Sequence, residues 1–120
     1  MPNSEIKPTN GVGTIILDLE SNGLLNNASR IHCIALHFCE DNLTETFNDE
    51  RISDDAKYLP MGNRSITTAI TTLETADVVV GHNIIGFDLP LIKRLYPFFT
   101  YPPVIVDTLL LSRLYHPDLY

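Results

Sequence analysis

Residues 14–24 read TIILDLESNGL, an apolar run that acquires two carboxylates, Asp18 and Glu20, and then turns at Gly23. Side chains alternate between the two faces of an extended chain, so Asp18 and Glu20 would project from the same face of a strand. Two like charges held that close repel each other at neutral pH, and a bound divalent cation stabilises such an arrangement. The stretch therefore predicts a strand that ends in a metal site. The alternative is a strand with a solvated acidic end.

The composition is that of one globular domain. The chain has 120 residues, of which 44% are apolar and 19% charged, and its formal net charge is -7. This charge argues against a domain that holds nucleic acid by a basic face, because phosphate binding draws on Lys and Arg. It is compatible with an acidic site where cations supply the positive charge. We find no membrane-spanning run and no secretory signal, so we expect a cytoplasmic protein with no membrane partner.

Hydrophobic periodicity and turn residues predict an α/β fold. We expect strands at 14–20, 31–38, 43–47, 77–82 and 104–106, and helices at 65–73, 87–96 and from 107 onward. The first three strands would form an antiparallel meander, and the alternating helices and strands that follow predict a sheet with packed helices. The apolar residues of 14–20 are consecutive, which predicts a central strand covered on both faces. Residues 1–13 are polar and broken by Pro and Gly, which predicts a flexible tail.

A second informative stretch, GHNIIGFD at 81–88, joins the end of a predicted strand to the start of a helix. Proteins of the α/β class place ligand sites at such junctions, where strand ends and helix N-termini open onto a crevice. Asp88 has two interpretations here. It is either a carboxylate of the site or the N-cap of the helix, where Asp is strongly preferred.

The two stretches together resemble a known family. Asp-x-Glu at the end of a first strand, followed by Asn-x-x-Gly-Phe-Asp at a helix start, resembles the first and second motifs of the DEDD family of 3′→5′ exonucleases. Residues 17–25 (LDLESNGLL), 31–33 (IHC) and 106–116 (VDTLLLSRLYH) look like the N-terminal proofreading domain of family A DNA polymerases of short-tailed bacteriophages. The resemblance runs from about Gly13 to the C-terminus.

The resemblance implies a ribonuclease-H-like domain at 14–120, with a mixed sheet and flanking helices. It also implies two-metal hydrolysis of the 3′-terminal phosphodiester of single-stranded DNA. Two Mg²⁺ or Mn²⁺ ions would be held by Asp18, which bridges both, by Glu20 on the water-activating ion and by Asp88 on the second. Leu24 matches a position that packs on the terminal base, and Asn83 matches a polar residue near the substrate end. Their alternative interpretations are ordinary core and a turn residue.

The third motif of the family, a Tyr or His four residues before a last Asp, has no counterpart before Tyr120. Tyr115 and Asp118 are three residues apart, and Pro117 interrupts the helix between them. Asp107 matches the Asp-Thr that opens an earlier helix of the family, so we interpret Asp107 as an N-cap.

These departures predict a domain that is truncated at its C-terminus, inactive or weak alone, and left with exposed apolar surface. The remainder of the polymerase, or a second polypeptide, would supply the third motif, in a bacterial host cell if the chain is phage-encoded. Two alternative functions stay open. One is a stand-alone DEDD-type exonuclease acting on DNA or RNA, and the other is a catalytically dead ribonuclease-H-like domain kept for binding or scaffolding.

Overall fold

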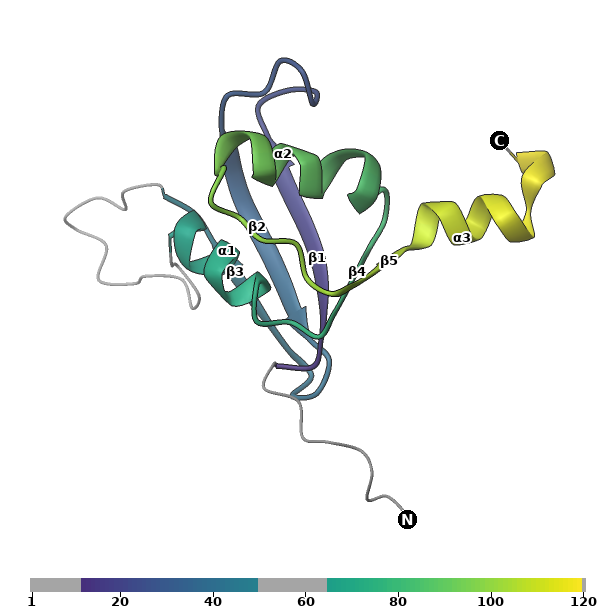
Figure 1. The fold of residues 1–120 in the computed structure, drawn as a ribbon, viewed down its shortest axis with the longest axis horizontal. Helices are drawn as coiled ribbons and strands as arrows, with labels where there is room; N and C mark the ends of the chain where they lie inside the picture. Colours follow the sequence, from purple (N-terminus) through teal and green to yellow (C-terminus); the bar gives the residue numbers. More distant parts are fainter. Residues whose placement is uncertain (1–11, 50–64, 120) are drawn as a thin grey trace, which may run out of the picture.

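The computed structural model describes residues 12–49 and 65–119 of the chain. These residues are organised around a five-stranded sheet in the order β3-β2-β1-β4-β5 (Figure 1). The elements in chain order are β1 (Thr14–Ser21), β2 (Ile31–Phe38), β3 (Leu43–Phe47), α1 (Ile66–Leu73), β4 (Val78–Gly81), the π-helical turn η2 (Ile84–Asp88), α2 (Leu89–Leu95), β5 (Val104–Asp107), α3 (Thr108–Tyr115) and the 3₁₀ turn η3 (Pro117–Leu119).

The strand β1 joins an antiparallel and a parallel half of the sheet. It pairs antiparallel with β2, which pairs antiparallel with β3 across a turn at residues 39–42. Asn42 adopts a positive φ of 52° in this turn, a conformation that Asn tolerates better than most residues. On its other side β1 pairs parallel with β4, and β4 pairs parallel with β5. The sheet therefore has the predicted ribonuclease-H-like arrangement, an antiparallel meander extended by two parallel strands.

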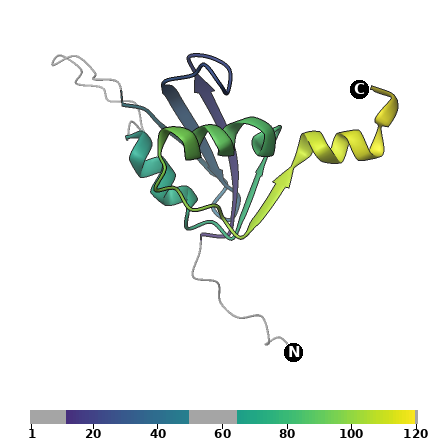
Figure 2. The ribbon, with the colours of Figure 1, turned by 45° about the horizontal axis from the view of Figure 1, so that its top comes forward.

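The helices α1 and α2 lie on the same side of the sheet (Figures 1 and 2). The helix α1 begins after Ser65, whose hydroxyl accepts a hydrogen bond from the Thr68 N–H at 3.1 Å, as an N-cap does. Pro90 stands in the first turn of α2, the part of a helix where proline is tolerated. Apolar side chains of both helices share one core with alternate residues of β1 and β2.

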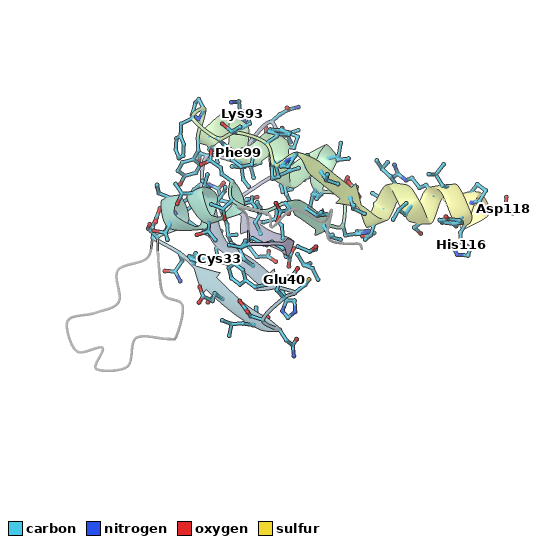
Figure 3. The ribbon with its side chains drawn as sticks, turned by 60° about the horizontal axis from the view of Figure 1, so that its bottom comes forward. Cys33, Glu40, Lys93, Phe99, His116 and Asp118 are labelled. Atoms are coloured by element: carbon cyan, nitrogen blue, oxygen red, sulfur yellow. The ribbon has the colours of Figure 1, made fainter. Side chains whose placement is uncertain are left out.

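The strand β1 is central but covered on only one face, which corrects the prediction of burial on both. Ile15, Leu17 and Leu19 are buried, whereas Ile16 between them is 42% exposed. The cause is the course of the chain after β5. Instead of packing on the second face of the sheet, α3 extends away from the body of the molecule, and none of its residues is buried (Figure 3).

The predicted exposed apolar surface is present on α3. Its exposed apolar residues are Leu110, Leu111, Leu114 and Tyr115. Tyr115 keeps 77% of its surface in solvent. Such a set of apolar side chains is typical of a surface that binds another molecule.

Of the predicted tail at 1–13, residues 1–11 lie outside the described residues. Its last two residues are bonded to the segment that follows α1. The Val12 N–H donates to the Thr75 carbonyl at 3.1 Å, and the Gly13 N–H donates to Asp77 Oδ2 at 3.0 Å. No helix in the described part of the chain is long and apolar enough to cross a membrane.

Candidate active site

The strand β1 places Asp18 and Glu20 on its exposed face. In the register with β2, Asp18 lies opposite Ala35 and Glu20 lies opposite Cys33. The register shifts between Glu20 and Ser21, so the regular ladder ends where the second carboxylate stands. The two acidic side chains therefore project from one face of the sheet near the end of β1, as the strand alternation predicts.

The connection from β4 to α2 has an irregular backbone. Asn83 adopts the left-handed conformation with a φ of 60°, and the π-helical turn η2 follows it. The Leu89 N–H bonds to the Ile84 carbonyl, so η2 runs directly into α2. Because that bond already satisfies the start of α2, Asp88 has no capping role, and its side chain makes no cap hydrogen bond. The N-cap interpretation of Asp88 is therefore wrong. π-helical turns are rare and often stand at functional sites.

Asp88 is a buried carboxyl group beside a second one. Its residue is 7% exposed. Burial, followed by the charge of Asp18, raises the pKa of Asp88 to about 7, against the opposing effect of hydrogen bonds from the backbone of Asp88 and Leu19. A smaller repulsion comes from Asp107. The structure thus brings Asp18 and Asp88 together at the end of β1, although 70 positions of sequence separate them (88 minus 18).

Glu20 does not complete a metal-binding group in this arrangement. Across residues 12–49 and 65–119, no three His, Cys, Asp or Glu side chains come together to hold a metal ion. The donor chemistry nevertheless fits a hard divalent cation, because carboxylate oxygens are the ligands that Mg²⁺ and Mn²⁺ prefer. A cation between Asp18 and Asp88 would also remove the repulsion that raises the Asp88 pKa. The metal assignment of Asp18, Glu20 and Asp88 stays a prediction.

Gly81 allows the close approach on which this pairing depends. A Cβ atom at Gly81 would lie 2.8 Å from the Leu17 carbonyl oxygen and would collide with the Ile84 side chain. Any side chain at Gly81 would therefore push the end of β4 and the turn after it away from β1. Because Asp88 lies at the end of that turn, a side chain at Gly81 is expected to displace Asp88 relative to Asp18.

The loop that follows β1 is held at two points. The Asn22 Oδ1 accepts hydrogen bonds from the N–H groups of Ser29 and Arg30 at 3.0 and 3.1 Å. From α2, the Arg94 guanidinium donates to the carbonyls of Leu25 and Ala28. Sequence reasoning missed this role of Arg94, and a basic residue in the last turn of a helix is too common a signal to have indicated it.

The two predicted substrate residues occupy different environments. Leu24 is 74% exposed, which excludes ordinary core and leaves it free for contact with another molecule. Asn83 is an exposed turn residue in the left-handed region, so its alternative interpretation is confirmed. A role for either residue in substrate binding stays a prediction.

Asp107 is the N-cap that the sequence predicts, and it also bonds across the sheet edge. Its carboxylate accepts from the Leu109 N–H at 2.9 Å at the start of α3. It also accepts from the N–H groups of Asn83 and Ile85, at 2.8 and 2.9 Å. Burial tends to raise the pKa of Asp107, but these backbone hydrogen bonds outweigh it and hold the pKa below its usual value. Asp107 is therefore an ionised acceptor of backbone hydrogen bonds, and its predicted role as an N-cap is confirmed.

No known protein family and no curated protein matches the sequence. Among solved structures, the chain is similar to a family B DNA polymerase from the hyperthermophilic archaeon Pyrobaculum calidifontis, with 21% identity and a TM-score of 0.49. The match covers 70% of this chain and 11% of that polymerase chain. The chain therefore spans only a small part of that polymerase, and the site described above rests on the chain's own residues.

Proposed function

We propose that this chain belongs to the 3′→5′ exonuclease, or proofreading, module of a phage-type DNA polymerase. Its substrate would be the 3′ end of single-stranded DNA, in the cytoplasm of a bacterial host. The observation that supports this proposal most is the buried Asp88 carboxyl beside Asp18, at the carboxylate-bearing end of β1. The two acids come from the two motifs that resemble the DEDD exonucleases.

The chemistry of the proposal divides between the chain and its ions. Bound Mg²⁺ or Mn²⁺ would supply Lewis-acid stabilisation of the phosphate and a water of lowered pKa. Asp18, Glu20 and Asp88 would hold the ions. Leu24, exposed on its braced loop, would contact the terminal base, and Asn83 would contact the substrate end.

The proposal also needs a third motif. Among the residues that the structure describes, no three His, Cys, Asp or Glu side chains come together, and the sequence has no counterpart of the third motif before Tyr120. We propose that the remainder of the polymerase, or a second polypeptide, supplies that motif. The chain alone is then expected to be inactive or very slow, because loss of one positioned catalytic group costs orders of magnitude in rate.

The test is release of labelled mononucleotide from the 3′ end of single-stranded DNA with Mg²⁺ or Mn²⁺. It is run with the chain alone, with the downstream polymerase segment added, and with Asp18→Asn in both preparations. The proposal predicts cleavage that appears or rises with the added segment and disappears in Asp18→Asn. Cleavage that Asp18→Asn leaves intact would refute the site.

A second function, a catalytically dead domain kept for binding or scaffolding, is favoured by one observation. The described carboxylates do not form a group of three around a common point. This function predicts no cleavage in any preparation and no effect of Mg²⁺ or Asp18→Asn on partner binding. A stand-alone DNA or RNA exonuclease is less favoured, because a net charge of -7 gives the chain little means to hold a phosphate backbone.

A further inference from the structure

The carboxylate of Asp107 joins two segments that are distant in the sequence. One oxygen, Oδ1, accepts from the N–H groups of Asn83 at 2.8 Å and Leu109 at 2.9 Å. The other, Oδ2, accepts from the Ile85 N–H at 2.9 Å. Asp107 is 5% exposed, so water does not compete for these bonds. An N-cap needs only the bond from the start of α3, and the other two bonds reach back to the turn before Asp88.

That turn depends on acceptors from outside itself. The leading N–H groups of a helical segment have no intrahelical partner. Here the segment starts at Asn83, in the left-handed region, and continues as the π-helical turn η2. Asp107 supplies acceptors for two of these N–H groups. The irregular backbone of 83–88 is thus stabilised by a residue of β5.

The same turn carries Asp88. Gly81, at the end of β4, lies opposite Asp107 in the parallel ladder. Within the turn the Phe87 N–H bonds to the Asn83 carbonyl at 3.0 Å, and the Leu89 N–H bonds to the Ile84 carbonyl. A displacement of Asn83 or Ile85 therefore passes along these bonds to Asp88.

We propose that Asp107 is a positioning residue that holds the 83–88 turn in its irregular conformation and so keeps the Asp88 carboxyl beside Asp18. It also makes the start of α3 and the candidate site depend on one buried group. The consequence for catalysis rests on the proposed function. The positioning of Asp88 by Asp107 does not rest on the proposed function, so the positioning and its effect on catalysis are tested separately.

The variant Asp107→Ser separates positioning from capping. Serine is a good N-cap, so its hydroxyl keeps the bond from the Leu109 N–H. It is shorter and has one oxygen, so it cannot also reach Asn83 and Ile85. The measurement is native-state hydrogen exchange of backbone amides by NMR, together with the resonance of the Asp88 carboxyl carbon. The control is Ser65→Ala, which removes the cap of α1 and leaves the turn untouched.

We expect Asp107→Ser to speed exchange at Asn83 and Ile85 by roughly 10- to 100-fold, the effect of losing a hydrogen bond to a charged group. The Asp88 carbon resonance should move, the Leu109 amide should stay protected, and Ser65→Ala should change none of the three signals. If the Asn83 and Ile85 amides and the Asp88 resonance stay as in the wild type, Asp107 is only a cap and the proposal fails.

Should Asp107→Ser not fold, Asp107→Asn carries the same test. Its amide has one acceptor oxygen in place of two, so whichever way the amide is turned, either the Asn83 or the Ile85 amide loses its acceptor and should exchange faster, with the Asp88 resonance again shifted. Unchanged exchange at both Asn83 and Ile85 would refute positioning in this variant also. In a preparation that shows cleavage dependent on Asp18, Asp107→Ser should lower kcat with little change in KM. If kcat stays unchanged while amide exchange at Asn83 and Ile85 speeds up, the result counts against the proposed function and not against the positioning role of Asp107.

Discussion

The sharpest prediction concerns the pH dependence of folding and the substitution Asp88→Asn. Burial and the charge of Asp18 raise the pKa of Asp88 to about 7 in the folded chain from its ordinary value of 3.8, so the native state keeps its proton over a range where the unfolded chain has lost it. Stability must then fall as the pH rises from about 4 to about 7. Each unit of pKa difference is worth ~1.4 kcal/mol, which gives a loss of about 4 kcal/mol by pH 8.

Asparagine is nearly isosteric with aspartate and does not ionise in this range. Asp88→Asn should therefore have a free energy of unfolding close to the wild-type value at pH 4 and exceed it by up to about 4 kcal/mol at pH 8. This is a large fraction of the ~5–15 kcal/mol that stabilises a typical domain. The assay is urea unfolding without divalent metal, followed by circular dichroism at unit pH steps from 4 to 8.

The matched control is Asp118→Asn, the same chemical change at an exposed carboxylate beyond the end of α3 (Figure 3). This variant should follow the wild-type pH profile. Parallel profiles for wild type and Asp88→Asn would refute the reasoning, because they would mean that Asp88 ionises as readily in the folded chain as in the unfolded one.

The remaining predictions concern the metal, the core and the loop after β1. Millimolar Mg²⁺ or Mn²⁺ should raise the wild-type melting temperature at pH 8 and leave that of Asp88→Asn unchanged; equal shifts would argue against Asp88 as a ligand. Leu17→Ala should cost about 2–5 kcal/mol in urea unfolding, whereas Ile16→Ala, on the open face, should cost less than ~1 kcal/mol; similar losses would contradict the one-sided burial of β1. Arg94→Met should speed amide exchange at Ala28 roughly fivefold, the effect of losing about 1 kcal/mol of hydrogen bonding, and unchanged exchange would show that Arg94 does not stabilise the loop.

The sheet could be predicted from the sequence because its signals are local. Strands at 31–38 and 43–47 follow from alternating or continuous apolar runs that end at turn residues, and the structure has the same bounds. Whether one face of a strand is covered depends on parts of the chain that are distant in the sequence. Ile15, Ile16 and Leu17 are equally apolar, yet Ile16 is exposed, and the helix that follows β5 has no buried residue.

The sequence predicted which acidic residues belong to the candidate site, but it did not predict the backbone conformation of the turn that carries Asp88. The motifs pointed to Asp18, Glu20 and Asp88, and the structure brings the first and last together. The capping alternative for Asp88 failed because a π-helical turn precedes α2, and no residue pattern in 84–88 announces such a turn. The bonds from Asp107 to Asn83 and Ile85 depend on the pairing of β4 with β5, which only the folded chain specifies.

Gly81 affects how the results of a mutagenesis screen on this chain should be interpreted. If a preparation with the added polymerase segment shows the proposed cleavage, random mutagenesis scored by that cleavage should return substitutions at Gly81 among the damaging ones, alongside those at the acidic residues. No substitution at Gly81 removes a chemical group, however, because what the wild type needs there is empty space between the Leu17 carbonyl and Ile84. Intolerance of substitution at this position would thus report a steric requirement and not a lost functional group, and a bulky side chain should disturb the proposed site while every acid remains in the sequence.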